Sequence, residues 1–138
     1  MLSVEAIDHI VINVADVESS AAWYERALGM TREIADAPGG QLPRTSMRFG
    51  RHKINLRPIE AAQEDWFTAE APQPGSDDLC FLTKVAPDAV VDHFRRCGIT
   101  IVLGPTMKKG VLGPIRSVYV RDPDGNLIEV SSYAENLG

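Results

Sequence analysis

The chain has few cysteines, no excess of basic residues and no long apolar run. Its two cysteines, Cys80 and Cys97, fall in an expected strand and at an expected helix end, so we expect free buried thiols rather than a disulfide or a metal pair. The net charge of −5 offers no basic field for nucleic acid. No apolar segment reaches the roughly 18 residues of a membrane span, and residues 1–5 lack the features of a signal peptide. We therefore predict a cytoplasmic protein without nucleic-acid or membrane partners.

The pattern that organises the sequence is an internal repeat. Each half opens with an apolar strand that leads into an amphipathic helix ending at a glycine. Gly29 and Gly98 are 69 positions apart (98 minus 29), and the same offset carries His9 onto Asp78. A period of this length predicts a duplicated supersecondary unit, because one copy alone cannot bury its apolar face.

The first copy reads as one strand, one helix and three further strands. We expect strands at 7–14, 31–35, 46–49 and 53–57, a helix at about 17–28, and a break at Pro38-Gly39-Gly40. Asp16 suits the N-cap of this helix, and Gly29 suits the position after its end. Residues 59–76 read as a linker that Trp66 and Phe67 pin to the body.

The second copy repeats this order. We expect strands at 78–83, 99–103, 116–121 and 127–131, a helix at 87–97, and an exposed loop at 104–114. Asp122-Pro123-Asp124-Gly125 has the composition of a type I turn. Lys108-Lys109 is expected as a solvated loop tip, with a mobile lid over an anionic ligand as the alternative. The sequence thus predicts an α+β fold of two βαβββ modules in one domain, 1–138, with module one at about 5–58, the linker at 59–76 and module two at about 77–133.

Four polar residues interrupt the apolar strands at corresponding places in the two copies, namely His9, Asn55, Asp78 and Glu129. A carboxylate inside an apolar strand costs several kcal/mol unless it is paired, protonated or bound to a cation. Because the four donors share positions in the repeat, we predict that they bind one divalent cation. Such oxygen-rich donors favour Mg, Mn or Zn.

Each donor also has a plainer explanation when it is taken alone. The alternatives are a core role for His9, a backbone hydrogen bond for Asn55, a cap or solvent contact for Asp78, and an ion pair of Glu129 with Arg48 or Arg116. His52 and His93 are expected at the surface, because neither follows the apolar pattern of its element.

Three segments of the chain resemble the vicinal oxygen chelate superfamily of glyoxalase I, fosfomycin-resistance proteins, bleomycin-resistance proteins and extradiol dioxygenases. They are Ile7-Asp8-His9-Ile10-Val11, Trp23-Tyr24-Glu25-Arg26-Ala27-Leu28-Gly29-Met30 and Tyr119-Val120-Arg121-Asp122-Pro123-Asp124-Gly125-Asn126-Leu127-Ile128-Glu129. Residues 53–56 and 74–81 look like the subgroup called glyoxalase domain-containing protein 5, which includes virulence-associated bacterial members. The resemblance implies paired βαβββ modules that form a cupped mixed sheet around a metal, with ligands from the outer strands.

Two of the ligand positions match the superfamily pattern and two depart from it. His9 matches the first-strand histidine and Glu129 the last-strand glutamate, whereas Asp78 replaces a second histidine found in many members and Asn55 replaces a glutamate of glyoxalase I. The predicted ligand set has one histidine fewer than an extradiol dioxygenase needs, which argues against that activity. Asn55 cannot accept a proton at neutral pH, which argues against glyoxalase I activity unless Glu129 is the base.

The resemblance and the donor set together imply a metal-dependent, glyoxalase-related enzyme of the lyase or isomerase type. Its divalent metal, Mn, Zn, Mg or Ni, would chelate two neighbouring oxygens of a small substrate. Glu129 would be catalytic, while Tyr119 and Asn55 would line the substrate site. The alternative is a metal-free protein that sequesters a ligand, as bleomycin-resistance relatives do. Open sheet edges and the resemblance also predict a homodimer.

Overall fold

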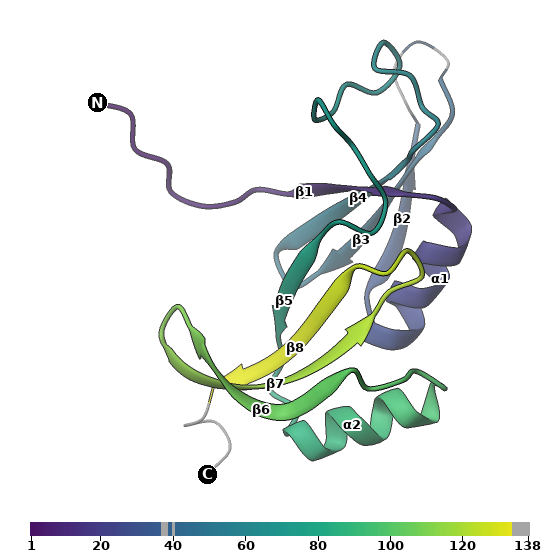
Figure 1. Cartoon of the computed structure of the whole chain (residues 1–138). Helices are drawn as coiled ribbons and strands as arrows, with labels where there is room; N and C mark the ends of the chain where they lie inside the picture. The colour runs from purple at the N-terminus through teal and green to yellow at the C-terminus, as the bar shows by residue number, and fades with distance from the viewer. Residues whose placement is uncertain (37–38, 40, 134–138) are drawn as a thin grey trace. The chain divides into compact units, whose positions relative to one another are not determined.

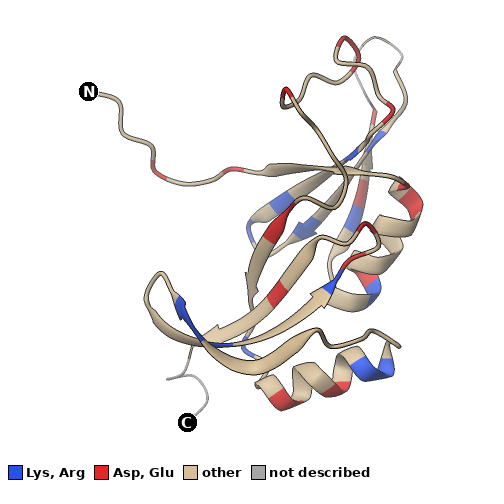
Figure 2. Cartoon of the chain, in the orientation of Figure 1, with Lys and Arg blue, Asp and Glu red and all other residues tan. Residues whose placement is uncertain are grey.

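The computed structural model describes residues 1–36, 39 and 41–133. Contacts between Cα atoms divide the chain into two compact units, Met1–Pro74 and Gly75–Gly138 (Figure 1). Of the break expected at Pro38-Gly39-Gly40, Pro38 and Gly40 lie outside the described residues. No helix in the described part of the chain is long and apolar enough to span a membrane. Figure 2 shows Lys and Arg residues interspersed with Asp and Glu residues in both units.

The first unit is a four-stranded mixed sheet with one helix. Its elements are β1 (Ile10–Val14), α1 (Val17–Leu28), β2 (Thr31–Ala35), β3 (Arg44–Phe49) and β4 (His52–Pro58), and the strand order is β1-β4-β3-β2. β1 runs parallel to β4, and the other pairs are antiparallel. The helix packs on β3 and β4. Alternate strand residues are buried on that side of the sheet, namely Ile12, Val14, Met47, Ile54 and Leu56.

Both ends of α1 form as the sequence predicts. The Asp16 side chain accepts a hydrogen bond from the Ser19 backbone N–H at 2.9 Å, which satisfies one of the free donors of the first turn. Gly29 ends the helix in the left-handed conformation, with φ of 66°. These two residues fix the length of the helix and hence which of its side chains face the sheet.

The second unit has the same topology. It contains β5 (Asp78–Leu82), α2 (Pro87–Arg96), β6 (Leu103–Gly110), β7 (Gly113–Arg121) and β8 (Leu127–Tyr133), in the strand order β5-β8-β7-β6. β5 is parallel to β8, as β1 is to β4. Val90 and Phe94 of α2 are buried, and α2 packs on β7 and β8. Each unit is therefore a βαβββ module, which confirms the predicted duplication and the α+β class.

The predicted turn between β7 and β8 is confirmed, and its side chains hold it closed. The Gly125 N–H donates to the Asp122 carbonyl at 3.0 Å. The Asp122 carboxylate accepts from the backbone N–H groups of Asp124 and Asn126, at 3.0 and 2.9 Å, and from the Asn126 side-chain amide at 2.8 Å. Asn126 in turn accepts from the Asp77 N–H at 2.8 Å. This network joins the turn to the segment that leads into β5.

The largest error in the sequence prediction concerns residues 99–114. No strand forms at 99–102, and the predicted loop is instead β6, which pairs antiparallel with β7 as a hairpin. Lys108-Lys109 therefore lies within a strand rather than at a loop tip. Pro105 does not prevent the pairing, because β6 is an edge strand and its register shifts between Leu103 and Thr106.

Three smaller predictions were also wrong. β1 begins at Ile10, three residues later than expected, and Ile7 is exposed. Phe67 is exposed and does not pin the linker, whereas the Arg44 guanidinium lies 4.2 Å from the ring centroid of Trp66. Cys80 is a free cysteine as expected, but it is exposed rather than buried.

Candidate functional site

Of the two predicted donors of the first unit, Asn55 lies on the sheet face that α1 does not cover. It is opposite Val11 of β1 in the parallel ladder. Ile10 and Ile54, the next pair in this ladder, lie on the other side with the core. His9 comes directly before β1, which begins at Ile10, so it lies outside the paired part of the strand.

The second unit has two predicted donors on the corresponding face. Cys80 of β5 lies opposite Glu129 of β8, and Asp78 comes two residues before Cys80 within the same strand. Strand alternation therefore places Asp78 and Glu129 on one face of this sheet as diagonal neighbours. Glu129 holds the ladder position in this unit that Asn55 holds in the first.

His9 is not a core residue, so the plain explanation considered for it is wrong. Its side chain is 43% exposed, and its Nδ1 lies 2.7 Å from a carboxylate oxygen of Asp8. Since a carboxylate only accepts hydrogen bonds, Nδ1 carries the proton and donates it. This bond lowers the pKa of Asp8. In the neutral imidazole the other ring nitrogen, Nε2, has a lone pair, and this is the form of histidine that binds metals.

Asn55 is half-buried and is hydrogen-bonded to a side chain rather than to the backbone. Its Oδ1 accepts from the Ser46 hydroxyl at 2.7 Å, and Ser46 lies opposite it on β3. Asp78 is exposed at the first residue of β5.

Glu129 is half-buried near the middle of the second sheet, where two serine hydroxyls orient its carboxylate. Ser117 donates to Oε2 at 2.5 Å, and Ser131 donates to the same oxygen at 3.2 Å. The two serines lie opposite each other on β7 and β8, and their hydroxyl oxygens are 2.7 Å apart. Hydroxyl groups that fix one carboxylate oxygen are a common way of orienting a metal ligand or a catalytic acid or base.

The ion pairs considered for Glu129 do not form. Arg48 pairs with Glu33 at 3.5 Å in the first unit. Arg116 lies one residue before Ser117 on β7 and therefore points to the opposite face from Glu129. Among the described residues, Glu129 has no Lys or Arg ion-pair partner.

Tyr119 lies opposite Glu129 and is held in its protonated form. Burial, followed by the hydrogen bond with Glu129, raises the pKa of Tyr119 to about 12. Although Cys80 as a residue is exposed, partial desolvation of its thiol raises the pKa of that group, and a hydrogen bond with Ser131 opposes the rise. The charges of Glu129 and Asp78 contribute to both shifts. The two predicted carboxylate ligands of this unit thus act on the same small group of side chains.

A cavity of about 430 Å³ lies on this face of the second unit. Its polar lining consists of Cys80, Lys108, Lys109, Tyr119, Glu129 and Tyr133. The sequence prediction included Tyr119 and Glu129 and gave Lys108-Lys109 a role at a ligand only as an alternative, but it missed the two serines and the thiol as members of the site. The alternation of Ser117 with Tyr119, and of Glu129 with Ser131, could have indicated the serines, whereas Lys108 was hidden by the expected loop.

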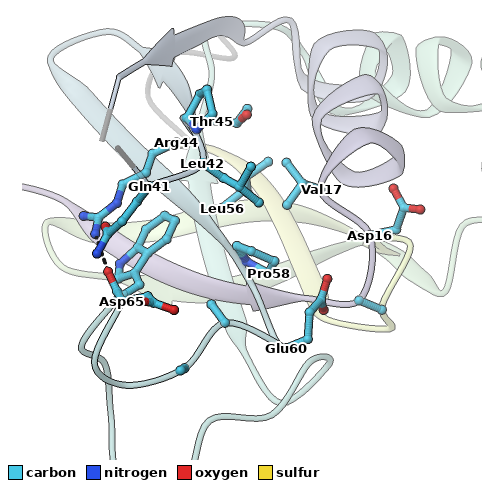
Figure 3. Close-up of a pocket in the computed structure, with 15 residues that line it drawn as sticks. Asp16, Val17, Gln41, Leu42, Arg44, Thr45, Leu56, Pro58, Glu60 and Asp65 are labelled. Atoms are coloured by element: carbon cyan, nitrogen blue, oxygen red, sulfur yellow. Dashed lines mark hydrogen bonds between the residues drawn. The ribbon is translucent and has the colours of Figure 1, made fainter. Parts of the chain in front are cut away.

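A larger cavity, of about 830 Å³, lies in the first unit (Figure 3). Apolar side chains make up much of its wall, namely Val17, Leu42, Leu56, Pro58 and Trp66. Asp16, Glu60 and Asp65 also line it, and Arg44 donates to the Asp65 carbonyl at 3.1 Å. None of the four predicted donors is part of this cavity.

One wall of this larger cavity is held by a buried arginine, Arg57, which is 1% exposed. Its guanidinium donates to the carbonyl oxygens of Ala61 and Trp66, at 2.6 and 3.0 Å, and to the Asn13 side chain at 2.8 Å. All three acceptors are neutral, so Arg57 serves to tie the segment after β4 to the sheet. The predicted linker is thus attached to the first sheet by the hydrogen bonds of Arg57 and by the contact of the Arg44 guanidinium with the Trp66 ring.

Within the part of the chain that the structure describes, no three His, Cys, Asp or Glu side chains gather so that they could hold a metal ion. His9 and Asn55 belong to the first unit, and Asp78 and Glu129 to the second. The four-residue cation site therefore stays a prediction.

Residues 6–130 match the family described as the Glyoxalase/Bleomycin resistance protein/Dioxygenase superfamily. The chain belongs to this superfamily. It is 42% identical over 130 residues to virulence protein STM3117 of Salmonella typhimurium, an alignment that covers 94% of this chain and 85% of that protein. It is 43% identical over 137 residues to glyoxalase domain-containing protein RDO1 of Mycosarcoma maydis, covering 97% and 72%.

Solved structures support the same assignment. An integron cassette protein from the mobile metagenome of V. Cholerae superimposes with a TM-score of 0.87 at 38% identity, covering 97% of this superfamily member and 99% of that chain. Two proteins share the fold alone, a lactoylglutathione lyase from Agrobacterium tumefaciens at 23% identity and TnmS3, an antibiotic binding protein from Streptomyces, at 22%. Their TM-scores are 0.68 and 0.70. The fold therefore accommodates both catalysis and ligand binding.

Proposed function

We propose that this superfamily member is a metal-dependent enzyme of the lyase or isomerase type that acts on a small substrate with two neighbouring oxygens. The observation that supports this most directly is the placement of Asp78 and Glu129 on the helix-free face of the second unit, with Asn55 at the corresponding ladder position of the first. His9, Asp78 and Glu129 would hold a divalent cation, Mn, Zn, Mg or Ni, and Asn55 or water would complete its shell. When bound, the cation would act as a Lewis acid toward the negative charge that develops on the substrate oxygens.

Three features of the residues present support such a cation. Glu129 is half-buried and has no Lys or Arg partner among the described residues, so a cation would compensate its charge. Ser117 and Ser131 hold one carboxylate oxygen, as hydrogen-bonding partners of metal ligands often do. His9 donates through Nδ1 to Asp8, which leaves Nε2 as the ligand atom.

The chain's own groups would then carry the proton chemistry. Glu129 is the carboxylate that we assign as general base, because Asn55 cannot take a proton at neutral pH. Tyr119, with a pKa of about 12, stays protonated and can donate a hydrogen bond to Glu129 or to a substrate oxygen. The shared fold with a lactoylglutathione lyase is compatible with this type of reaction.

The test is a thermal unfolding titration of the full chain with Mn²⁺ or Zn²⁺ after treatment with chelator. A ligand at a hundred times its Kd stabilises the folded state by about 2.7 kcal/mol. For a chain of this length, that corresponds to a rise of roughly 9 °C in Tm. Glu129→Gln should lose most of this rise. His52→Ala is the matched control, because His52 is exposed and lies on the opposite face of β4 from Asn55. A Glu129→Gln variant that keeps the parental response would refute the assigned ligand.

A metal-free, ligand-sequestering protein is the second candidate, and the larger cavity favours it. This cavity has an apolar wall, three carboxylates and Trp66, and it contains no predicted metal donor. An apolar or aromatic cation would suit it. Binding of such a ligand to chelator-treated protein should quench the fluorescence of Trp66, and Trp66→Phe should remove that change. Trp23 is buried in α1 and would contribute an unchanged background.

We also propose that the protein is a homodimer, since each sheet ends in edge strands. The cytoplasmic location stays a prediction from the sequence.

A further inference from the structure

Lys108 projects from β6 onto the same face as Glu129. Thr106 lies opposite Ser117, and Lys108 lies opposite Ile115, so both residues of β6 share the face of the Ser117–Glu129 hydrogen bond. The Lys108 ammonium is 5.9 Å from the centroid of the Tyr119 ring. This is near the outer limit of a cation–π contact, so the ring alone is a weak partner for the charge.

Lys108 forms no ion pair within residues 1–36, 39 and 41–133, which the structure describes. Glu129 lines the same cavity of about 430 Å³. The lining of this cavity thus contains a lysine ammonium and a glutamate carboxylate that do not form an ion pair with each other. A volume of this size is within the range of small-molecule sites.

A second donor lies near the end of β6. The Tyr133 hydroxyl oxygen accepts a hydrogen bond from the Leu112 N–H at 3.1 Å. Its own proton therefore remains available for donation. Gly110 allows this placement, because a Cβ there would come 3.0 Å from the Tyr133 hydroxyl. Tyr133 lines the same cavity as Lys108 and Glu129.

We infer that Lys108 and the Tyr133 hydroxyl form a subsite for a carboxylate group of the substrate. This inference rests on the proposed function, in which the reacting oxygens lie at Glu129. The substrate is then a small organic anion with one carboxylate apart from its two neighbouring oxygens. One ammonium and one neutral donor match the single charge and two oxygens of a carboxylate. A phosphate group, with more charge and a third terminal oxygen, would call for further donors.

Calorimetric titration of the Mn²⁺-treated full chain with lactate and with malate tests the subsite. Both acids carry a carboxylate next to a hydroxyl, and malate has an additional carboxylate. We expect malate to bind about tenfold more tightly than lactate, as one charged hydrogen bond allows. Lys108→Met should remove most of this difference, and Lys108→Arg should retain it. Lys84→Met is the matched control, since Lys84 is an exposed lysine outside the cavity.

The same titration on chelator-treated protein separates this inference from the proposed function. Succinate has two carboxylates and no neighbouring hydroxyl, so its Lys108-dependent binding without metal would support the subsite even if the metal proposal failed. If Mn²⁺ binds through Glu129 while malate and lactate bind equally, the subsite is refuted and the enzyme proposal stands. Inorganic phosphate that displaces malate more effectively than succinate does would overturn the carboxylate assignment. Lys108 is exposed, so unchanged thermal unfolding of Lys108→Met is expected and excludes misfolding as the cause.

Discussion

Replacing Arg57 with methionine should destabilise the first unit more than replacing any exposed arginine. The change keeps an unbranched, apolar chain in the buried space but removes three hydrogen bonds, to Asn13, Ala61 and Trp66. Hydrogen bonds to a charged group contribute about 1.5–3 kcal/mol each. The sum overstates the loss, because removal of the guanidinium also ends the cost of keeping its charge buried, and the freed carbonyls can regain water as the segment loosens. We expect a net loss of about 3 kcal/mol.

For 138 residues, an unfolding entropy of about 2.1 cal/mol/K per residue converts this loss into a fall in Tm of roughly 10 °C. Differential scanning calorimetry of the variant and the parent measures it. Arg48→Met is the matched control, since Arg48 is an exposed arginine of the same sheet with one long ion pair, and its Tm should move by about 2 °C or less. If Arg57→Met melts within about 2 °C of the parent, the segment after β4 is held by something other than Arg57. The Arg57→Met variant should also bind less tightly any ligand that quenches the fluorescence of Trp66.

Three further predictions concern other parts of the molecule. Burial, followed by the charge of Asp122, raises the pKa of Asp77 above its ordinary 3.8. The ionised form of Asp77 therefore destabilises the fold progressively as the pH rises through the raised pKa. Asp77→Asn should unfold at a higher denaturant concentration than the parent at about pH 7, and this difference should disappear below about pH 3. Asn55→Glu should gain methylglyoxal–glutathione isomerase activity over a parent that has little, and high parental activity would contradict the assignment of Asn55 as a missing base. Light scattering at micromolar concentration should give the mass of a homodimer, and a strictly monomeric mass would refute it.

Local sequence rules were sufficient where side chains decide the structure. The N-cap at Asp16, the end of α1 at Gly29 and the turn at Asp122 all depend on short-range hydrogen bonds or backbone conformations that a few neighbouring residues determine. The two carboxylates and the repeat were also visible, because a charged residue in an apolar strand and a fixed offset need no knowledge of packing.

The errors arose where backbone pairing decides the structure. β6 has no regular apolar alternation, and it is a strand because its main chain bonds to β7. In contrast, the largely apolar stretch 7–14 predicts a strand that starts at Ile7, but β1 begins only at Ile10, and Ile7 is exposed. The position of Lys108 beside Tyr119 follows from the β6–β7 register, so a sequence reading that missed β6 could not find it.

The turn from Asp122 to Asn126 determines more than the path of the chain. It fixes which residue of β8 lies opposite Tyr119, and side chains alternate between the two faces of a sheet. Gain or loss of a single residue there would move Glu129 to the side of α2 and bring an apolar neighbour into its place. The evolution of this site is therefore constrained in a particular way: exchange of side chains on β8 can alter its chemistry gradually, but a change of length in the turn would abolish it in one step.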